Sequence, residues 1–323
     1  MNTIPLTHDA NKPTYTVLGG LHQRNCKDKF PVSVLVLNRG PRLYRASLFQ
    51  DLTHIGFDSI ISIELPPESA EIESLAGRFP HVRFIMFKQE LTIGDYINVG
   101  MREACTPFVF VIWNDMKLAT STLSSRFFDK VGELDMACLV PCLADAGNNS
   151  LPTNINPAVS RRVIKTVALI PKKDHEKTLY PFDWCGIYHR EKFIRLGGFD
   201  FTIRQPCWQR LDFGLRAWLW GESICHVQAL KLLYTGSSPV EDTTVSVDYG
   251  RVWLKNIAPQ YRVDMAHLPA SRFLMYLLQS GLGPLQSWRF FRAARRWVDT
   301  NAYRFKQDIT RLVDLWDPVT PDE

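Results

Sequence analysis

The stretch Phe108-Val109-Phe110-Val111-Ile112-Trp113-Asn114-Asp115 joins an unbroken apolar run to a polar Asn-Asp pair. A continuous run of β-branched and aromatic residues is typical of a strand that is buried on both faces of a parallel sheet. In open α/β sheets, ligands bind beyond the carboxyl ends of the strands. The stretch therefore predicts a central strand and places Asn114-Asp115 at a functional position.

Strands and helices alternate on the N-terminal side of this stretch. Strands are expected at residues 32–37, 59–63 and 82–87, and helices at 42–55, 68–78 and 93–104. This alternation predicts βαβ units and an α/β fold with a doubly wound, mainly parallel sheet. The residues that follow the strands are candidates for ligand binding: Asn38-Arg39, Glu64, Lys88 and Asn114-Asp115.

The rest of the chain is expected to complete one large domain and to end in helices. Strands at 135–141 and 185–189 follow, with helices at 122–130, 190–196 and 211–221, an extended segment at 223–233, and a turn-rich excursion at 143–180. Residues 248–317 are predicted to be helical. We therefore expect an irregular leader at 1–30, the α/β domain at 31–255 and a helical C-terminal extension at 256–323.

Composition limits the classes of function. The 323 residues are 46% hydrophobic and carry a formal net charge of only +5, so a large core is expected and a nucleic acid polymer is not an expected partner. Seven cysteines without a CxxC pair indicate reduced thiols in a cytoplasmic protein. The first thirty residues lack an apolar signal core, and no apolar stretch approaches the roughly 20 residues of a membrane span.

Asp115 is a candidate metal ligand. A carboxylate at an open strand end can hold a hard divalent cation against a diphosphate, whose oxygens complete the coordination shell. The alternative is that Asn114 and Asp115 cap the following turn, as isolated Asn-Asp pairs commonly do. The pair alone does not decide between these interpretations.

The order of motifs resembles that of the family-two glycosyltransferases, which share the GT-A fold. The resemblance covers about residues 31–255. Its most specific part is Leu196-Gly197-Gly198-Phe199-Asp200, which looks like the family's Gly-Gly-Phe-Asp turn. Other similar segments are the strands at 32–36 and 61–64, the Asn-x-Gly element at 94–100, the strand entry at 106–108 and the acceptor-side strand at 185–193.

This resemblance implies transfer of a sugar from a nucleoside-diphosphate sugar to a glycan or lipid-linked acceptor. It implies a donor site at Asn38, Glu64, Asn98, Asn114 and Asp115, with Mn²⁺ or Mg²⁺ on Asp115. Asp183 and Trp184 would lie on the acceptor side. Simpler alternatives remain: Glu64 as a solvated strand end, Asn98 as a surface amide and Trp184 as a buried core residue.

The sequence departs from the family pattern at three charged positions. Asn114 replaces the first acid of the Asp-x-Asp motif, Gln209-Arg210 replace Glu-Asp, and Tyr234 replaces a histidine. Asp212 is then the candidate general base, and Arg210 could stabilise the leaving diphosphate. Alternatively, Asp212 pairs with Arg216 on one helix face, and the protein binds a nucleotide or glycan without turnover.

The segment at 286–306 is basic and aromatic at helical spacing. It could lie on an anionic membrane surface, which would make the protein peripheral to the membrane. The alternative is a C-terminal helix whose aromatic stripe packs onto the preceding domain.

Overall fold

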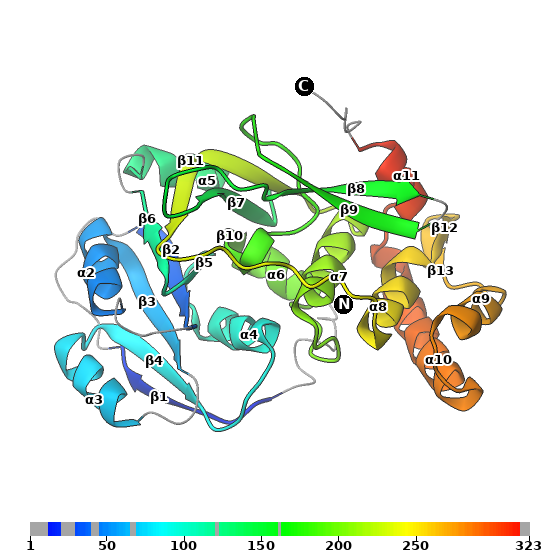
Figure 1. Cartoon of the computed structure of the whole chain (residues 1–323), viewed down its shortest axis with the longest axis horizontal. Coiled ribbons are helices and arrows are strands. Elements are labelled where there is room, and N and C mark those ends of the chain that lie inside the picture. The colour runs from blue at the N-terminus through cyan, green and yellow to red at the C-terminus, as the bar shows by residue number, and fades with distance from the viewer. Residues whose placement is uncertain are drawn as a thin grey trace.

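The structure is a computed structural model that describes residues 12–20, 30–39, 45–64, 69–119, 123–160 and 163–316. A nine-stranded sheet runs through it in the order β1-β4-β3-β2-β5-β10-β7-β11-β6, with helices packed around it (Figure 1). The pairs β4-β3, β3-β2, β2-β5 and β7-β11 are parallel, and the remaining four pairs are antiparallel. The predicted α/β fold with a mainly parallel central sheet is confirmed.

The predicted strands and helices of the first half form with small shifts at their ends. The strands are β2 (Phe30–Leu37), β3 (Phe57–Glu64), β4 (Val82–Phe87) and β5 (Phe108–Trp113). The helices between them are α2 (Arg45–Ile55), α3 (Ser69–Arg78) and α4 (Ile93–Glu103). Residues 109–112 of β5 are at most 1% exposed, as expected for a central strand.

The second half of the sheet is mixed. It contains β6 (Met116–Leu118), β7 (Cys138–Ala144), β10 (Gly186–His189) and β11 (Ile224–Tyr234), and the turn-rich excursion forms a separate hairpin of β8 (Asn154–Ser160) and β9 (Val163–Leu169). Its helices are α5 (Ser125–Glu133), α6 (Arg190–Leu196) and α7 (Pro206–Leu219). The antiparallel insertion of β10 between β5 and β7 brings residues from far along the chain to the end of β5.

The expectation of an irregular leader was wrong for one part of residues 1–30. Tyr15–Gly19 forms β1, which pairs antiparallel with β4 at the edge of the sheet. The strand has only five residues, and it is stabilised by pairing with β4 and by the hydrogen bond from Tyr15 to Glu103. Tertiary pairing rather than local pattern therefore determines this strand.

The C-terminal region is mostly helical, as predicted. It contains α8 (Val247–Val252), the π-helix η4 (Trp253–Ile257), α9 (Arg272–Gln279), α10 (Pro284–Asn301) and α11 (Ile309–Asp314), with a small hairpin of β12 (Gln260–Arg262) and β13 (Met265–His267). Trp297 of α10 stacks on Trp220, and Trp316 packs on Trp218. None of the described helices is both long and apolar enough to cross a membrane.

Candidate functional site

Arg39 links the two strand ends at the centre of the sheet. Its Nε lies 2.8 Å from Asp115 Oδ2, and its Nη2 donates to Asp115 Oδ1 at 3.2 Å. The backbone N–H of Arg39 donates to Asn114 Oδ1, which ties the end of β2 to the end of β5. The guanidinium also lies over the Trp113 ring, 4.2 Å from its centroid. Asn114 and Asp115 therefore lie where the sequence places them, but around an arginine.

Asp183 approaches the same guanidinium from the segment before β10. Its Oδ2 lies 2.8 Å from Arg39 Nη1 and accepts a hydrogen bond from the Tyr234 hydroxyl at 2.9 Å. Asp183 has a left-handed backbone (φ 50°), which is uncommon for a residue other than glycine. Its carbonyl is held by the indole N–H of Trp113 at 2.9 Å. Burial raises the pKa of Asp183 above its usual value, although the charges of Arg39 and Arg210 oppose this shift.

These side chains do not fit a divalent metal centre as they are arranged. Both carboxylate oxygens of Asp115 face Arg39, and Asp183 is occupied by Arg39 and Tyr234. Tyr234 is a poor substitute for a histidine ligand because burial raises the pKa of its phenol well above the usual value. Among the described residues, no three His, Cys, Asp or Glu side chains gather as a metal site would require. The cation that Asp115 and Asp183 share is the guanidinium of Arg39.

Glu64 is neither solvated nor open to a ligand. It is fully buried, and its Oε2 lies 2.5 Å from Arg45 Nη2 at the start of α2. Its other oxygen accepts from Ser62 at 2.7 Å, and Asn38 donates to the carbonyl of Ile63 beside it. Asn38 and Glu64 thus meet at the ends of β2 and β3, as their positions predict, but they form a buried network with Arg45.

Asn98 holds the Gly-Gly-Phe-Asp turn. Its amide donates to the carbonyl of Phe199 at 2.8 Å and accepts from the N–H of Phe199 at 2.9 Å. Gly198 has φ +63°, and a Cβ there would lie 2.3 Å from Asn98 Oδ1. Gln209 adds a second link, because it accepts from Gly94 and donates to Thr92 and to the carbonyl of Asp200. The Asn98 side chain therefore makes both of these hydrogen bonds with the turn.

Asp212 lies inside the protein and every contact it makes is internal. The side chain is 0% exposed and pairs with Arg216 at 2.5 Å and with Lys255 at 3.0 Å, while Asn256 donates to it at 2.8 Å. Lys255 also bridges to Asp200 of the turn at 2.7 Å. Burial alone would raise the pKa of Asp212, but Arg216 and Lys255 more than offset this and hold the pKa well below its usual value. The contact between Asp212 and Arg216 is the pairing that the sequence analysis gives as the alternative to a general base at Asp212.

Arg210 and Trp184 form a second cluster beside Asp183. The Arg210 guanidinium lies over the Trp184 ring, 4.5 Å from its centroid, so one face of that buried indole is already covered. Arg210 Nη2 lies 2.7 Å from Glu241 Oε1, and Tyr180 donates to Glu241 Oε2 at 3.1 Å. Trp184 directly follows Asp183 in the chain. The cluster of Arg210, Trp184 and Glu241 therefore adjoins the cluster of Arg39, Asp115 and Asp183.

Known structures support the fold assignment. A crystal structure of GalNAc-T7 with UDP, GalNAc and Mn²⁺ matches 92% of this chain with a TM-score of 0.55 and 14% sequence identity. The chain has the GT-A fold. It spans 60% of the GalNAc-T7 chain. A crystal structure of residues 1–349 of TarS from S. aureus in complex with UDP matches 81% of this chain and 70% of its own, with 15% identity and a TM-score of 0.49. No protein-family model and no curated protein matches the sequence.

In this GT-A fold, sequence reasoning missed two polar partners, Glu241 and Tyr180, and gave no specific role to a third, Arg39. Arg39 was flagged only as a residue after a strand, and its position beside Asn38 was the available signal. Glu241 and Tyr180 lie in irregular segments whose sequence carries no motif. Their meeting with Arg210 depends on how the chain crosses the sheet, which local patterns do not encode.

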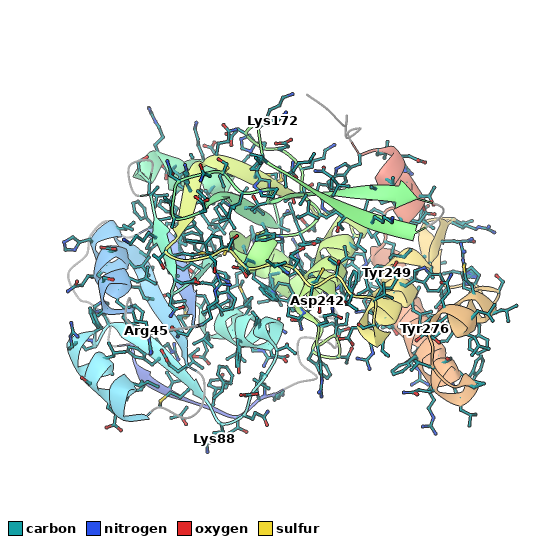
Figure 2. The ribbon with its side chains drawn as sticks, viewed as in Figure 1. Arg45, Lys88, Lys172, Asp242, Tyr249 and Tyr276 are labelled. Atoms are coloured by element: carbon teal, nitrogen blue, oxygen red, sulfur yellow. The ribbon has the colours of Figure 1, made fainter. Side chains whose placement is uncertain are left out.

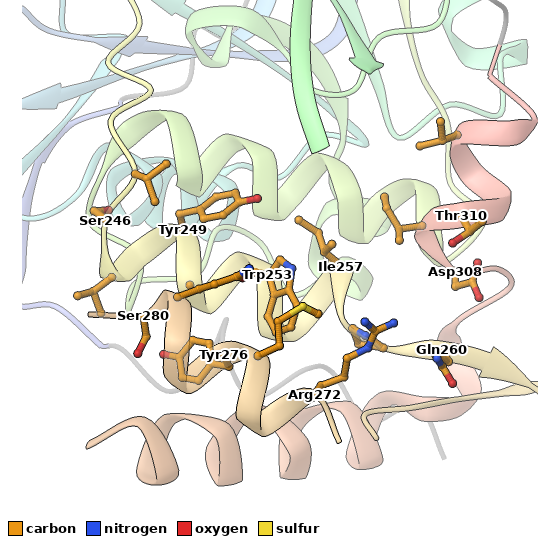
Figure 3. Close-up of a pocket in the computed structure, with 18 of the residues that line it drawn as sticks. Ser246, Tyr249, Trp253, Ile257, Gln260, Arg272, Tyr276, Ser280, Asp308 and Thr310 are labelled. Carbon is orange, nitrogen blue, oxygen red and sulfur yellow. The ribbon is translucent and has the colours of Figure 1, made fainter. Parts of the chain in front are cut away.

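A separate cavity of about 1260 Å³ lies among the C-terminal elements. Tyr249, Trp253 and Tyr276 line it together with Arg272 and Asp308 (Figure 3). It shares no residue with the Arg39–Asp115 cluster. Figure 2 shows Tyr276 near one end of the GT-A fold and Arg45 near the other. The polar cluster at the strand ends and this cavity are therefore two separate features of the fold.

Proposed function

We propose that this protein binds a nucleoside-diphosphate sugar at the Arg39–Asp115 cluster and transfers its sugar to an acceptor hydroxyl. The observation that carries the proposal is the position of Arg39. It is a fixed cation held between Asp115 and Asp183, at the end of β2 where GT-A sheets open to ligands. The UDP in the GalNAc-T7 structure makes UDP the first nucleotide to test.

Arg39 supplies the charge that a diphosphate requires. A guanidinium offers a planar set of donors that suits phosphate oxygens, and charge-assisted hydrogen bonds are roughly twice as strong as neutral ones. Arg39 side-chain atoms are 25% exposed, so a ligand can reach them. Asp115 and Asp183 fix the guanidinium in place, which lowers the entropy cost of binding. In this proposal the guanidinium, rather than a divalent ion on Asp115, contacts the diphosphate.

Transfer would break the bond between the sugar C1 and the diphosphate oxygen and form a bond to the acceptor oxygen. The acceptor proton must pass to a base. Glu241 fits this role better than Asp212, because Glu241 is partly exposed beside Arg210, whereas Asp212 is fully buried in the core. Arg210 lies over Trp184, which directly follows Asp183, and we assign it the role of stabilising the departing diphosphate.

The second candidate is binding without transfer. It is favoured by a specific observation: Glu241 is paired with both Arg210 and Tyr180, and Asp212 with three partners. A carboxylate held by an arginine is a weak base. In this case the protein would present the nucleotide sugar or a glycan to another molecule.

Calorimetric titration with UDP, GDP, dTDP and their sugars, with Mn²⁺ and with EDTA, tests the site. We expect micromolar to millimolar binding of one nucleotide that EDTA leaves unchanged. Arg39→Ala should weaken that binding about 10- to 150-fold, the value of one charged hydrogen-bonding group. Arg83→Ala is the matched control, because Arg83 pairs with Glu103 at 2.5 Å but lies on β4 away from the site.

Hydrolysis of the bound donor separates the two candidates. Turnover that falls in Glu241→Gln by about 10²–10⁴-fold while binding stays intact would support transfer with Glu241 as base. Binding without hydrolysis or transfer across a panel of glycan and lipid-linked acceptors would favour the silent protein. Failure of every nucleotide to bind would refute both transfer from a nucleotide sugar and silent binding of a nucleotide.

A further inference from the structure

The helices α9 and α10 form a hairpin with one buried face and one exposed face. The buried face of α10 consists of Ser287, Phe291, Ala294, Val298 and Asn301, and it packs on the preceding elements as the sequence alternative predicts. Phe273 of α9 contacts both Trp288 and Phe291 with ring centroids 5.3 Å apart. The hairpin lies at the end of the molecule opposite α2 and α3 (Figure 1).

The exposed face of this hairpin carries large apolar side chains. Leu274 is 63% exposed, Leu278 78%, Leu285 80% and Trp288 49%. Leu274 and Leu278 are one turn apart on α9, and Leu285 and Trp288 occupy the same relation on the first turns of α10. Leu278 and Leu285 flank the connection between the helices, where Ser280 and Ser287 lie within hydrogen-bond distance of each other. Large exposed apolar side chains that gather on one helical hairpin are a feature of interaction surfaces.

Four arginines continue the same exposed face along α10. Arg289, Arg292, Arg295 and Arg296 are all exposed, and none of them forms an ion pair with a carboxylate in the described part of the chain. Trp288, Arg292, Arg295 and Arg296 border a hollow of about 340 Å³, in which Asp299 is the acidic residue. The exposed face thus has apolar side chains at its tip, the connected ends of α9 and α10, and arginines further along α10.

We propose that the exposed face of the α9–α10 hairpin binds an anionic phospholipid surface. Leucines at the tip would enter the boundary between headgroups and acyl chains, Trp288 would lie at the headgroup level, and the arginines would contact lipid phosphates. A nucleic acid would use the arginines but gain little from four exposed apolar side chains in water. A lipid surface uses both parts, and this inference does not depend on the donor site.

Sedimentation of the full chain with vesicles tests the proposal. We expect strong binding to phosphatidylcholine vesicles that contain about 30% phosphatidylglycerol, and weak binding to phosphatidylcholine alone. The triple variant Arg289→Gln/Arg292→Gln/Arg296→Gln should bind the anionic vesicles about 100-fold more weakly. The double variant Leu278→Ser/Leu285→Ser should lose at least about tenfold in affinity, and more of the remaining binding should be removed by salt.

The control is a triple variant of equal charge on another surface, Arg126→Gln/Lys130→Gln/Lys165→Gln, whose residues are also exposed. It should bind the vesicles like the wild-type protein, and all variants should keep the wild-type melting temperature because the altered side chains are at the surface. The proposal is overturned if anionic vesicles do not bind the wild type, or if both triple variants behave alike. It is also overturned if the wild type is a dimer that Leu278→Ser/Leu285→Ser converts to a monomer, because a second copy would then cover this face.

Discussion

The Arg39 cluster and the Asp212 cluster contain the same chemical groups at different depths. In the first, Arg39 and Asp115 are 25% and 26% exposed and lie at a strand end. In the second, Arg216 and Asp212 are 1% and 0% exposed beneath the Gly-Gly-Phe-Asp turn. A charged pair that water and ligands can reach is available for binding, whereas a pair sealed in the core can only hold the structure together.

Asp183 and Asp212 show the same contrast for two buried carboxylates. The pKa of Asp183 is raised by burial, and that of Asp212 is lowered because two cations outweigh its burial. Both carboxylates are hydrogen-bonded within the fold, but neighbouring cations offset the burial of Asp212 and do not fully offset that of Asp183. A carboxylate with an incompletely compensated charge beside an accessible arginine is the one that a bound ligand or proton can influence.

The largest expected effect is that of Asp212→Asn on stability. The change removes a charge that Arg216 and Lys255 both contact and leaves two buried cations with weaker partners. We expect the free energy of unfolding to fall by about 3–5 kcal/mol, the usual cost of breaking a buried ion pair. Urea unfolding of the variant and the wild type measures this difference. A loss below about 1 kcal/mol would show that Asp212 is not a structural residue of this cluster.

The sequence predicts the strand ends well because their cause is local. The apolar runs at 32–37 and 108–112 identify buried strands, and polar residues follow them, so Asn38, Asn114 and Asp115 lie near one another as expected. The two glycines of the Gly-Gly-Phe-Asp turn also have a local cause, because both have left-handed backbone angles that favour glycine.

The partners of these residues cannot be read from the sequence in the same way. Asp183 reaches Arg39 from 144 residues away only because β10 enters the sheet antiparallel to β5. Asp212 is a plausible base in the sequence because it is the carboxylate nearest to Gln209-Arg210, and only the position of Lys255 on η4 reveals how fully it is paired. Burial is a property of the whole fold, and it separates residues that look alike in sequence.

Acid titration should sharpen the contrast between the two buried carboxylates. Asp212 has a folded pKa below its ordinary value of 3.8, so its stabilisation is present above that pH and is lost as the pH falls through the folded pKa. Asp183 has a raised folded pKa, so its stabilisation is present at low pH and is lost as the pH rises through that value.

Unfolding free energies measured between about pH 7 and pH 3 should therefore change in opposite ways. Asp212→Asn should flatten the loss of stability below about pH 5. Asp183→Asn should remove a gain that the wild-type protein shows on acidification towards about pH 4, by roughly 1.4 kcal/mol for each unit by which its pKa is raised. Parallel changes in the two variants would contradict the contrast.

The smallest expected effect on stability is that of Asp115→Asn. The ion pair with Arg39 is partly exposed, and such pairs contribute only about 0–1 kcal/mol, so unfolding in urea should hardly change. Nucleotide binding is the decisive measurement. If Asp115 held a metal, the metal would be lost with the carboxylate, and nucleotide binding would become undetectable with Mn²⁺ as well as with EDTA. If Arg39 is the cation, Asp183 still holds it, and Asp115→Asn should keep binding within about tenfold of the wild-type affinity with no response to EDTA.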